Sequence, residues 1–507
     1  MRRTLIAIAE LLVLSALIIA TRCANFADVF VGGEIYFTDA DCYARMTRVR
    51  ICLEHPGTIV RHHGFENFPS GTTPHTTAPF DYLIAVLSTL MGGAIDVAGA
   101  IVSPALALLT GWFLWWWSRR IRLPYRGALL LLFALSPILV HGTELGRPDH
   151  QSLVLALIAI ALCAEWTLTT TDSRGWSVTS GVAWGLALWV SLYEPLILLA
   201  ILGLVQLIAA RKIFLTRNRL IGWAVCGALV LLALLIERRL PPWPATGETF
   251  SNWAATIGEL RAVWPNDPVW LRWTGLLLIP FPALLWIAFR SRTIPVFLAT
   301  LLTASFALTI WQARWAYFFM MLFALSLPIC LSFIKHRIAG WTLIAISFFP
   351  ILKDWDERLW PNDFQRGAIA ERRMENIGMR QTALQIDGPF LAPWWWSPAI
   401  AYWSRQPGVA GSSHEALPGI ADSARFFAAT DSEVAKSILL KTKVAWVLAY
   451  DADRTVANSA AILGLPPPQT PLGKILDRTP SQAPPFLRLS AQNPAGKLFR
   501  VQIFQEK

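Results

Sequence analysis

The sequence LIAIAELLVLSALIIA at residues 5–20 indicates the fold class, because it is the first of a series of apolar runs. A helix that crosses a bilayer needs roughly 17 to 25 mostly apolar residues. About eleven runs approach that length, near residues 4–22, 94–117, 126–141, 151–168, 177–193, 195–210, 219–237, 270–289, 293–311, 315–334 and 337–353. The segment after the first run offers no clear cleavage site, so we expect a retained helix rather than a removed signal peptide.

The composition also indicates an integral membrane protein. Of the 507 residues, 55% are hydrophobic and 15% are charged, whereas soluble domains usually carry about 25% charged residues. The formal net charge is +11, and clusters of basic residues lie in short loops between apolar runs, at 118–122, 211–219, 290–292 and 335–337. Such loops mark the cytoplasmic side of a membrane. The charge therefore reflects topology, and we expect no nucleic-acid partner.

The other loops and the tail then fall on the external face of the inner (plasma) membrane. They are 23–93, 141–150, the turn at Glu194, 238–269, 312–315 and 354–507. The tail is less apolar, with strands predicted at 444–450 and 498–504 and helices at 423–430 and 432–440. We predict a polytopic α-helical membrane domain at 1–353, with the long first external loop 23–93, and a mixed α/β external domain at 354–507.

The first external loop contains the stretch Thr38-Asp39-Ala40-Asp41-Cys42-Tyr43. Its two carboxylates, Asp39 and Asp41, are either solvated or ligands of a hard cation such as Mg²⁺ or Mn²⁺, which prefers oxygen donors. A loop of this length is usually functional. The same loop holds Cys23, Cys42 and Cys52, which could include a disulfide.

A second polar stretch, Gly146-Arg147-Pro148-Asp149-His150-Gln151, lies at the external end of a predicted span. Asp149, flanked by Arg147, His150 and Gln151, is a candidate cation ligand with supporting neighbours. The alternative is a polar cap at the membrane interface.

Three further external residues are candidates. Glu259 ends the stretch Thr256-Ile257-Gly258-Glu259, and it is either a ligand or a solvated surface residue. Arg314 either reaches the lipid headgroups or binds a phosphate, for which a guanidinium group is well shaped. Glu194 is either an interfacial carboxylate or a site residue.

Together these stretches resemble the catalytic subunit of oligosaccharyltransferase, within the C-type membrane glycosyltransferases (GT-C), over nearly the whole chain. The resemblance implies that Asp41, with Asp39 as the alternative, is the acid of the first loop. It implies that Asp149 and Glu259 are the later acids and that Arg314 contacts the donor phosphate, with Arg147 beside it. It further implies a divalent cation, held by the residues Asp41, Asp149, Glu259, Gln151 and His150.

The chain departs from that family at three points. Gln151 stands where the family usually has an acid or a histidine, and the chain is about two spans short between the second and third motifs. The stretch Pro393-Trp394-Trp395-Trp396-Ser397-Pro398 keeps the family's tryptophans, which imply an acceptor-binding role for Trp394, Trp395 and Trp396. It lacks the acid that recognises the hydroxyl residue of an Asn-x-Ser/Thr acceptor.

The predicted function is therefore that of an inverting, metal-assisted glycosyltransferase. It would move a sugar or oligosaccharide from a polyprenyl phosphate or diphosphate carrier in the bilayer to a protein or envelope-glycan acceptor outside. One alternative is a relative that uses a polyprenyl monophosphate sugar to modify a lipid or polysaccharide. Two others are a transporter of lipid-linked sugars and a non-catalytic subunit. A transporter is disfavoured because the acids cluster in external loops and no inverted repeat is evident.

Overall fold

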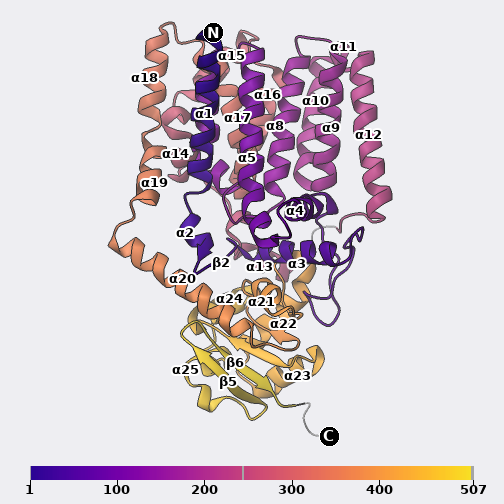
Figure 1. Ribbon diagram of the computed structural model, residues 1–507, viewed down its shortest axis with the longest axis vertical. Coiled ribbons are helices and arrows are strands. Elements are labelled where there is room, and N and C mark those ends of the chain that lie inside the picture. Colours follow the sequence, from indigo (N-terminus) through magenta and orange to yellow (C-terminus); the bar gives the residue numbers. More distant parts are fainter. Residues whose placement is uncertain (1, 243–244, 504–507) are drawn as a thin grey trace. The chain divides into compact units, whose positions relative to one another are not determined.

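The computed structural model describes residues 2–242 and 245–503 (Figure 1). Met1, position 504 of the last predicted strand and the final residues of the predicted external domain therefore lie outside the described residues. The chain divides into two compact units. Unit 1 comprises Met1–Ala27, Val97–Arg238 and Glu259–Asn362, and unit 2 comprises Asp28–Asp96, Arg239–Gly258 and Asp363–Lys507.

Unit 1 is helical. Its longer helices, several of which run side by side in Figure 1, are α1 (Arg2–Arg22), α5 (Ile95–Arg120), α6 (Arg126–Leu135), α8 (Gln151–Leu168), α9 (Arg174–Val190), α10 (Tyr193–Ala209), α12 (Arg217–Glu237), α15 (Phe281–Arg290), α16 (Val296–Trp311), α17 (Ala316–Leu331), α18 (Arg337–Ser347) and α19 (Phe349–Leu359). Shorter elements are α2 (Phe26–Val29), α7 (Pro137–His141), α11 (Arg211–Phe214), α14 (Val269–Thr274) and the 3-10 turns η1 (Gly258–Leu260), η2 (Gly275–Leu278) and η3 (Ala313–Trp315).

Each of the apolar runs predicted from the sequence is helical, as one helix or as a broken pair. Among the described residues, six helices are long and apolar enough to cross a membrane, or seven if the bent pair Val269–Leu278 and Phe281–Arg290 is one span. The other runs form helices shorter than 18 residues, among them α6, α10 and α16. The chain is thus a helical membrane protein, whereas the predicted number of spans stays a prediction.

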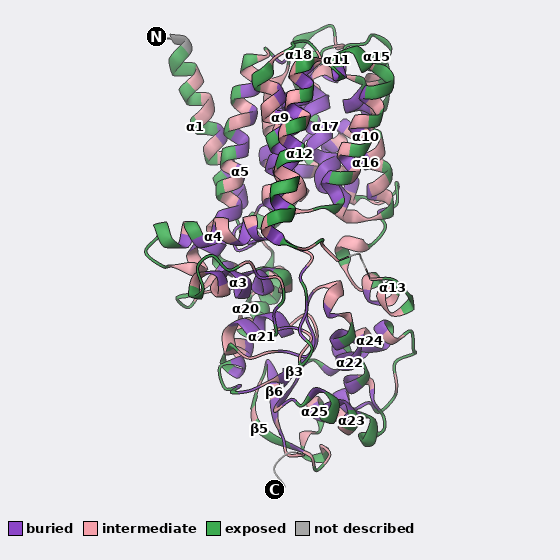
Figure 2. Ribbon diagram, turned by 90° about the vertical axis from the view of Figure 1, so that its right-hand side faces the viewer, coloured by how far each residue is buried: buried purple, intermediate pink, exposed green. Residues whose placement is uncertain are grey.

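The centre of unit 1 is α17. Its side chains are buried around the whole helix, from Ala316 to Leu331 with little interruption (Figure 2). A helix that is apolar on every side is typical of a position surrounded by other helices. Close packing elsewhere depends on small residues, because a Cβ atom on Gly181 of α9 would lie 2.0 Å from the Gly222 carbonyl oxygen of α12. Small residues of this kind let membrane helices approach closely.

Unit 2 contains a four-stranded mixed sheet in the order β3-β4-β6-β5, in which β3 and β4 are parallel and the other pairs are antiparallel. The strands are β3 (Phe390–Leu391), β4 (Trp446–Ala449), β5 (Leu487–Asn493) and β6 (Gly496–Val501). Around it lie α20 (Asp363–Ala383), α21 (Ser397–Ser404), η4 (His414–Ala416), α22 (Leu417–Ala428), α23 (Ser432–Thr442), α24 (Ala452–Leu463), α25 (Leu472–Arg478) and η5 (Pro480–Gln482). The predicted strands and helices of the tail correspond to β4, β6, α22 and α23, so a mixed α/β fold near the C-terminus is confirmed.

Most of the loop predicted to be external, residues 28–93, belongs to unit 2 by its contacts. It forms the hairpin of β1 (Phe30–Val31) and β2 (Glu34–Ile35), followed by α3 (Ala40–Glu54) and α4 (Ala78–Leu90); α13 (Glu248–Ala255) also lies in this unit. By contacts, unit 2 thus groups residues 28–96 with those from 363 onward, and the predicted domains 1–353 and 354–507 stay a prediction. All six cysteines are free thiols, so the structure forms no disulfide among Cys23, Cys42 and Cys52.

Candidate functional site

The loop before α8 places Asp149 and His150 in a buried position of unit 1. Asp149 is 7% exposed and His150 is 9% exposed. The Nδ1 atom of His150 lies 2.7 Å from Oδ1 of Asp149, and the Gln151 N–H donates to the same oxygen at 3.4 Å. A buried carboxylate therefore sits at the start of a helix, where the helix dipole favours negative charge.

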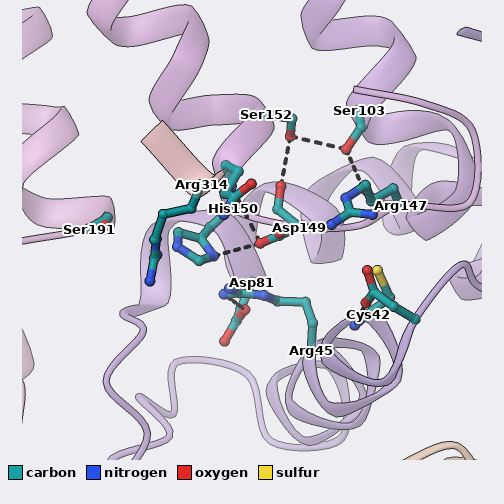
Figure 3. Close-up of polar contacts among 12 residues, drawn as sticks. Cys42, Arg45, Asp81, Ser103, Arg147, Asp149, His150, Ser152, Ser191 and Arg314 are labelled. Carbon is teal, nitrogen blue, oxygen red and sulfur yellow. Dashed lines mark hydrogen bonds and ion pairs between the residues drawn. The ribbon is translucent and has the colours of Figure 1, made fainter. Parts of the chain in front are cut away.

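Hydrogen bonds from two helices fix the backbone of this loop. Ser152 of α8 donates its hydroxyl to the Asp149 carbonyl oxygen at 2.8 Å. Ser103 of α5 donates to the carbonyl oxygen of Arg147 at 2.5 Å, and its hydroxyl lies 3.0 Å from that of Ser152 (Figure 3). The loop is thus held by α5 and α8 and is not a loosely solvated cap.

Arg147 contacts both Glu259 and His141. Its guanidinium donates to Oε1 of Glu259 at 3.2 Å and lies 3.2 Å from Nε2 of His141. The other ring nitrogen of His141 lies 2.8 Å from the hydroxyl of Tyr317 in α17. Arg147 is 4% exposed, whereas the side chain of Glu259 is 34% exposed. Arg147 therefore orients Glu259, whose side chain is partly exposed.

Arg314 forms an ion pair with Glu194, in which the carboxylate is nearly buried and the guanidinium is 24% exposed. Ser191 donates its hydroxyl to the second carboxylate oxygen of Glu194 at 2.9 Å. The Arg314 charge also interacts electrostatically with Glu259 and Asp149. Unit 1 thus contains Asp149, Glu259, Arg314 and Glu194, and the charge of Arg314 interacts with all three carboxylates, while their roles stay predictions.

Asp39 and Asp41 belong to unit 2, and they occupy different positions on α3. The carboxylate of Asp39 accepts a hydrogen bond from the Cys42 N–H at 3.0 Å, so Asp39 is the N-cap of the helix. Asp41 is exposed in the first turn and interacts electrostatically with His75. The capping role accounts for the position of Asp39, and the choice of Asp41 over Asp39 as the acid of the first loop stays a prediction.

Sequence reasoning missed a buried carboxylate in this loop. Asp81 of α4 is 4% exposed and accepts from Arg45 at 2.8 Å, and Arg48 lies 3.4 Å from its second oxygen. The two arginines are three residues apart, so they lie on one face of α3. That spacing is the signal that could have indicated a buried acidic partner.

The three tryptophans 394–396 pack within unit 2. Trp394 donates its indole N–H to Asn458 at 2.9 Å and packs edge-to-face on Trp253, and Trp396 packs edge-to-face on Tyr450. The cavity beside Trp394 and Trp395 has a volume of about 10 Å³, close to that of one water molecule. An acceptor could bind there only after a rearrangement.

The structure also gathers a set of ligand-type side chains that the sequence did not indicate. Among the described residues, His75, His414 and Glu415 place one donor atom each within 4.8 Å of one another. Burial disfavours the charged forms of both His75 and Glu415. Their mutual attraction outweighs it, raising the pKa of His75 and holding the pKa of Glu415 well below its usual range.

Comparisons with known proteins agree with this architecture. No family model matches the chain, and no curated protein matches it. Among solved structures, archaeal oligosaccharyltransferase AglB from Archaeoglobus fulgidus, in complex with an inhibitory peptide and a dolichol-phosphate, has a TM-score of 0.67 at 15% identity, over 100% of this chain and 75% of that chain. The same organism's oligosaccharyltransferase in complex with Zn and sulfate gives a TM-score of 0.68 at 14% identity, over 90% and 70% of the two chains.

A second kind of structure matches over nearly its whole length. ArnT from Cupriavidus metallidurans bound to undecaprenyl phosphate has a TM-score of 0.58 at 13% identity, over 98% of this chain and 97% of that chain. The chain thus has the fold shared by archaeal oligosaccharyltransferase and ArnT, which confirms at the level of the fold the resemblance read from its sequence.

The residues of unit 1 that the resemblance implies as ligands, Asp149, Glu259 and His150, are oxygen and nitrogen donors of types that Mg²⁺ or Mn²⁺ can use. Among the described residues, the group whose donor atoms lie within 4.8 Å of one another is a different one, His75, His414 and Glu415. The side-chain oxygen of Gln151 is buried and accepts no hydrogen bond from the described residues, so this predicted ligand position presents an unsatisfied acceptor.

Proposed function

We propose that the chain is a membrane glycosyltransferase that transfers a sugar or oligosaccharide from a polyprenyl phosphate or diphosphate carrier to an acceptor outside the inner membrane. The observation that supports it most is the group of Asp149, His150, Glu259 and Arg314 within unit 1. It combines buried acids with a partly exposed guanidinium, in a fold whose solved examples include complexes with dolichol-phosphate and undecaprenyl phosphate.

In this proposal the leaving group is the carrier phosphate. Arg314 binds one of its oxygens, since a guanidinium matches a phosphate in shape and charge. Glu194 holds Arg314 in place until the donor arrives. A bound Mg²⁺ or Mn²⁺ would neutralise charge on the phosphate. Asp149, Glu259, His150 and Gln151 would hold it, and the family resemblance implies Asp41 as a further ligand. Arg147 orients Glu259 and adds positive charge nearby.

The acceptor reacts at the face of the sugar opposite the leaving group, so the configuration inverts. Its nucleophile loses a proton, and the most suitable acceptors for that proton are Asp41, which is exposed, and Glu259, which is partly exposed. A positioned carboxylate of this kind contributes about two to four orders of magnitude in rate. Both residues belong to segments predicted to be external.

The test is mass spectrometry of polyprenyl-linked sugars from cells that carry wild type or Asp149→Ala. One carrier species should accumulate in the variant, and its mass would give the sugar and the number of phosphates. The matched control is Asp172→Ala, because Asp172 is exposed in a short loop and contacts Thr216 and Asn218. If nothing accumulates although the variant is stably inserted, the transporter and non-catalytic subunit become the better hypotheses.

A second candidate is a transferase that takes a single sugar from a polyprenyl monophosphate and modifies a lipid or polysaccharide. Two observations favour it. The stretch at Trp394–Ser397 lacks the family's acid, and the chain matches 97% of ArnT but 75% of AglB. Introducing an acid by Ser397→Asp or Trp396→Asp and assaying an Asn-x-Thr peptide separates the two. Gained peptide transfer supports the protein-modifying candidate, and continued silence supports this one.

A further inference from the structure

Two distant segments of unit 2 lie side by side around the His75 cluster. The Phe68 N–H donates to the Gly408 carbonyl oxygen at 3.1 Å, and the Gly408 N–H donates to the Phe65 carbonyl oxygen at 3.0 Å. The Ser412 N–H donates to the carboxylate of Glu66 at 3.0 Å. The first loop is therefore fixed on the segment that leads into η4, and side chains from both segments are held in a defined arrangement.

Three donor groups converge at this junction. The Nδ1 atom of His75 lies 2.7 Å from Oε1 of Glu415, and Nδ1 of His414 lies 3.5 Å from the other carboxylate oxygen. The two imidazole rings have their centroids 5.1 Å apart. The Glu415 side chain is 6% exposed and that of His414 is 18% exposed. Two histidines and one glutamate form a ligand set that zinc uses in proteins, at bond lengths of about 2.0 to 2.2 Å.

A simple ion pair does not account for the second histidine. One imidazolium balances the charge of Glu415, and the second imidazole can stay neutral, so charge balance does not explain why both rings face this carboxylate. Two imidazole nitrogens and one carboxylate oxygen within 4.8 Å of one another match the donor set of a zinc site with three protein ligands. The convergence of these three donor atoms is the observation that favours a metal ion.

The cluster also opens onto a cavity. His414 and Glu415 line a space of about 340 Å³ together with His62, Thr72 and Thr73. Gly71 makes room for this arrangement, because a Cβ atom there would lie 2.5 Å from Nε2 of His62. A metal with three protein ligands at the rim of such a cavity keeps a fourth position that a water molecule or an anionic oxygen can occupy.

We propose that His75, His414 and Glu415 bind a zinc ion that ties the first external loop to the C-terminal region and leaves one coordination position facing the cavity. This site shares no residue with the catalytic group proposed above, and it does not depend on that function. The zinc would stabilise unit 2, since a metal that binds the folded state alone shifts the folding equilibrium toward it.

The test is the metal content of the full-length protein, purified in detergent with trace zinc and measured by mass spectrometry of the elements. Wild type should hold about one zinc ion per chain at this site. His414→Ala and Glu415→Gln should reduce the zinc content by about tenfold or more. His414→Cys should keep it, because a thiolate also binds zinc. That rescue separates loss of a ligand from loss of folding.

Two control variants test whether the zinc binds at this cluster. His62→Ala changes the same cavity without removing a proposed ligand and should keep the zinc. Asp149→Ala should also keep it, although it abolishes the proposed transfer. A second readout is the unfolding temperature, which EDTA should lower in wild type but not in Glu415→Gln. Unchanged zinc content in His414→Ala and Glu415→Gln would overturn the proposal, as would zinc loss in Asp149→Ala alone.

Discussion

The guanidinium of Arg314 is held by the buried carboxylate of Glu194, and the hydroxyl of Ser191 donates to the other oxygen of that carboxylate. A guanidinium fixed in this way is oriented before a ligand arrives, which reduces the entropy lost on binding. It is also the only side chain of the pair that solvent reaches to a substantial extent, at 24% against 5%. Glu194 is therefore a positioning residue, and Arg314 is the group that would meet a phosphate.

This pair gives a graded prediction for transfer activity. Arg314→Ala should lower kcat/KM for the lipid-linked donor by about two to three orders of magnitude, the usual effect of removing one charge-stabilising group. Glu194→Gln keeps the hydrogen bond with Ser191 but removes the charge, so its loss should be smaller, about tenfold, and mainly in KM. Donor titrations with purified variants measure both.

Arg314→Lys is the matched control for charge. It should retain part of the donor binding while it loses the two-pronged geometry of the guanidinium. If Glu194→Gln were as inactive as Arg314→Ala with an unchanged KM, Glu194 would act directly in the chemistry and the positioning role would be wrong.

A second prediction concerns stability. Asp81 balances two buried arginines, Arg45 and Arg48, and removing one member of a buried ion pair commonly costs about 3 to 5 kcal/mol. Asp81→Asn should therefore lower the unfolding temperature in detergent and increase proteolysis of the first loop. Asp363→Asn is the control, because the Asp363 and Arg366 side chains are 94% and 65% exposed, and exposed pairs contribute about 0 to 1 kcal/mol.

An unfolding temperature of Asp81→Asn equal to that of wild type would show that water or a rearranged side chain replaces the lost charge. Where Asp81→Asn is less stable than wild type, the double variant Arg45→Gln with Asp81→Asn should recover part of the lost stability, because it removes one of the uncompensated arginines.

Much of the fold was predictable because it depends on local pattern. Long apolar runs such as 5–20 form helices, and short continuous apolar runs such as 444–450 form buried strands. The grouping of the first loop with the C-terminal region was not predictable, because it rests on contacts such as that between Glu66 and Ser412, 346 residues apart. No local pattern encodes a pairing at that separation.

The candidate site was also predictable only in part. Asp149 stood out because an acid beside Arg147 and His150 is rare at the end of an apolar run. Glu194 remained ambiguous, because a lone interfacial glutamate and a partner of Arg314 look alike in one sequence. The tryptophans at 394–396 carried a family signal, yet the packing that gives Trp394 its partner Asn458 follows only from the folded chain.

A third prediction uses pH. Burial lowers the pKa of His63 to about 2 from an ordinary value of 6.5, and the positive charge of Arg48 acts in the same direction. The folded protein thus keeps His63 neutral, while the unfolded chain binds a proton as the pH falls below 6.5. The unfolded state then binds more protons than the folded state, so stability decreases with falling pH in this range.

The measurement is the unfolding temperature of wild type and His63→Phe between pH 7 and pH 4.5, a range that stays above the pKa of His63 in the folded protein. Phenylalanine keeps the stacking of this ring on Phe65, whose centroid lies 3.8 Å away, but cannot take up a proton. The variant should lose less stability than wild type on acidification. Parallel curves for the two proteins would mean that His63 is protonated in the folded state.

The last prediction concerns the packing of α9 against α12. A Cβ atom on Gly222 would lie 2.3 Å from the Ser177 carbonyl oxygen. This oxygen belongs to the backbone, so it cannot rotate away as a side chain could. Gly222→Ala should therefore separate the two helices and disturb the buried ion pair between Glu165 and Arg219, whose atoms are 2.6 Å apart. Overpacking of this kind typically costs about 1 to 3 kcal/mol.

Gly227 provides the matched control, because it lies on the same helix and a Cβ atom there meets nothing within 4 Å. Gly227→Ala should insert and unfold like wild type or slightly better, since alanine favours helix over glycine by roughly 1 kcal/mol. Thermal unfolding in detergent and the yield of folded protein compare the two variants. Equal behaviour of Gly222→Ala and Gly227→Ala would mean that α9 and α12 are not in backbone contact, and Glu165 and Arg219 would then have to meet by a different packing of these helices.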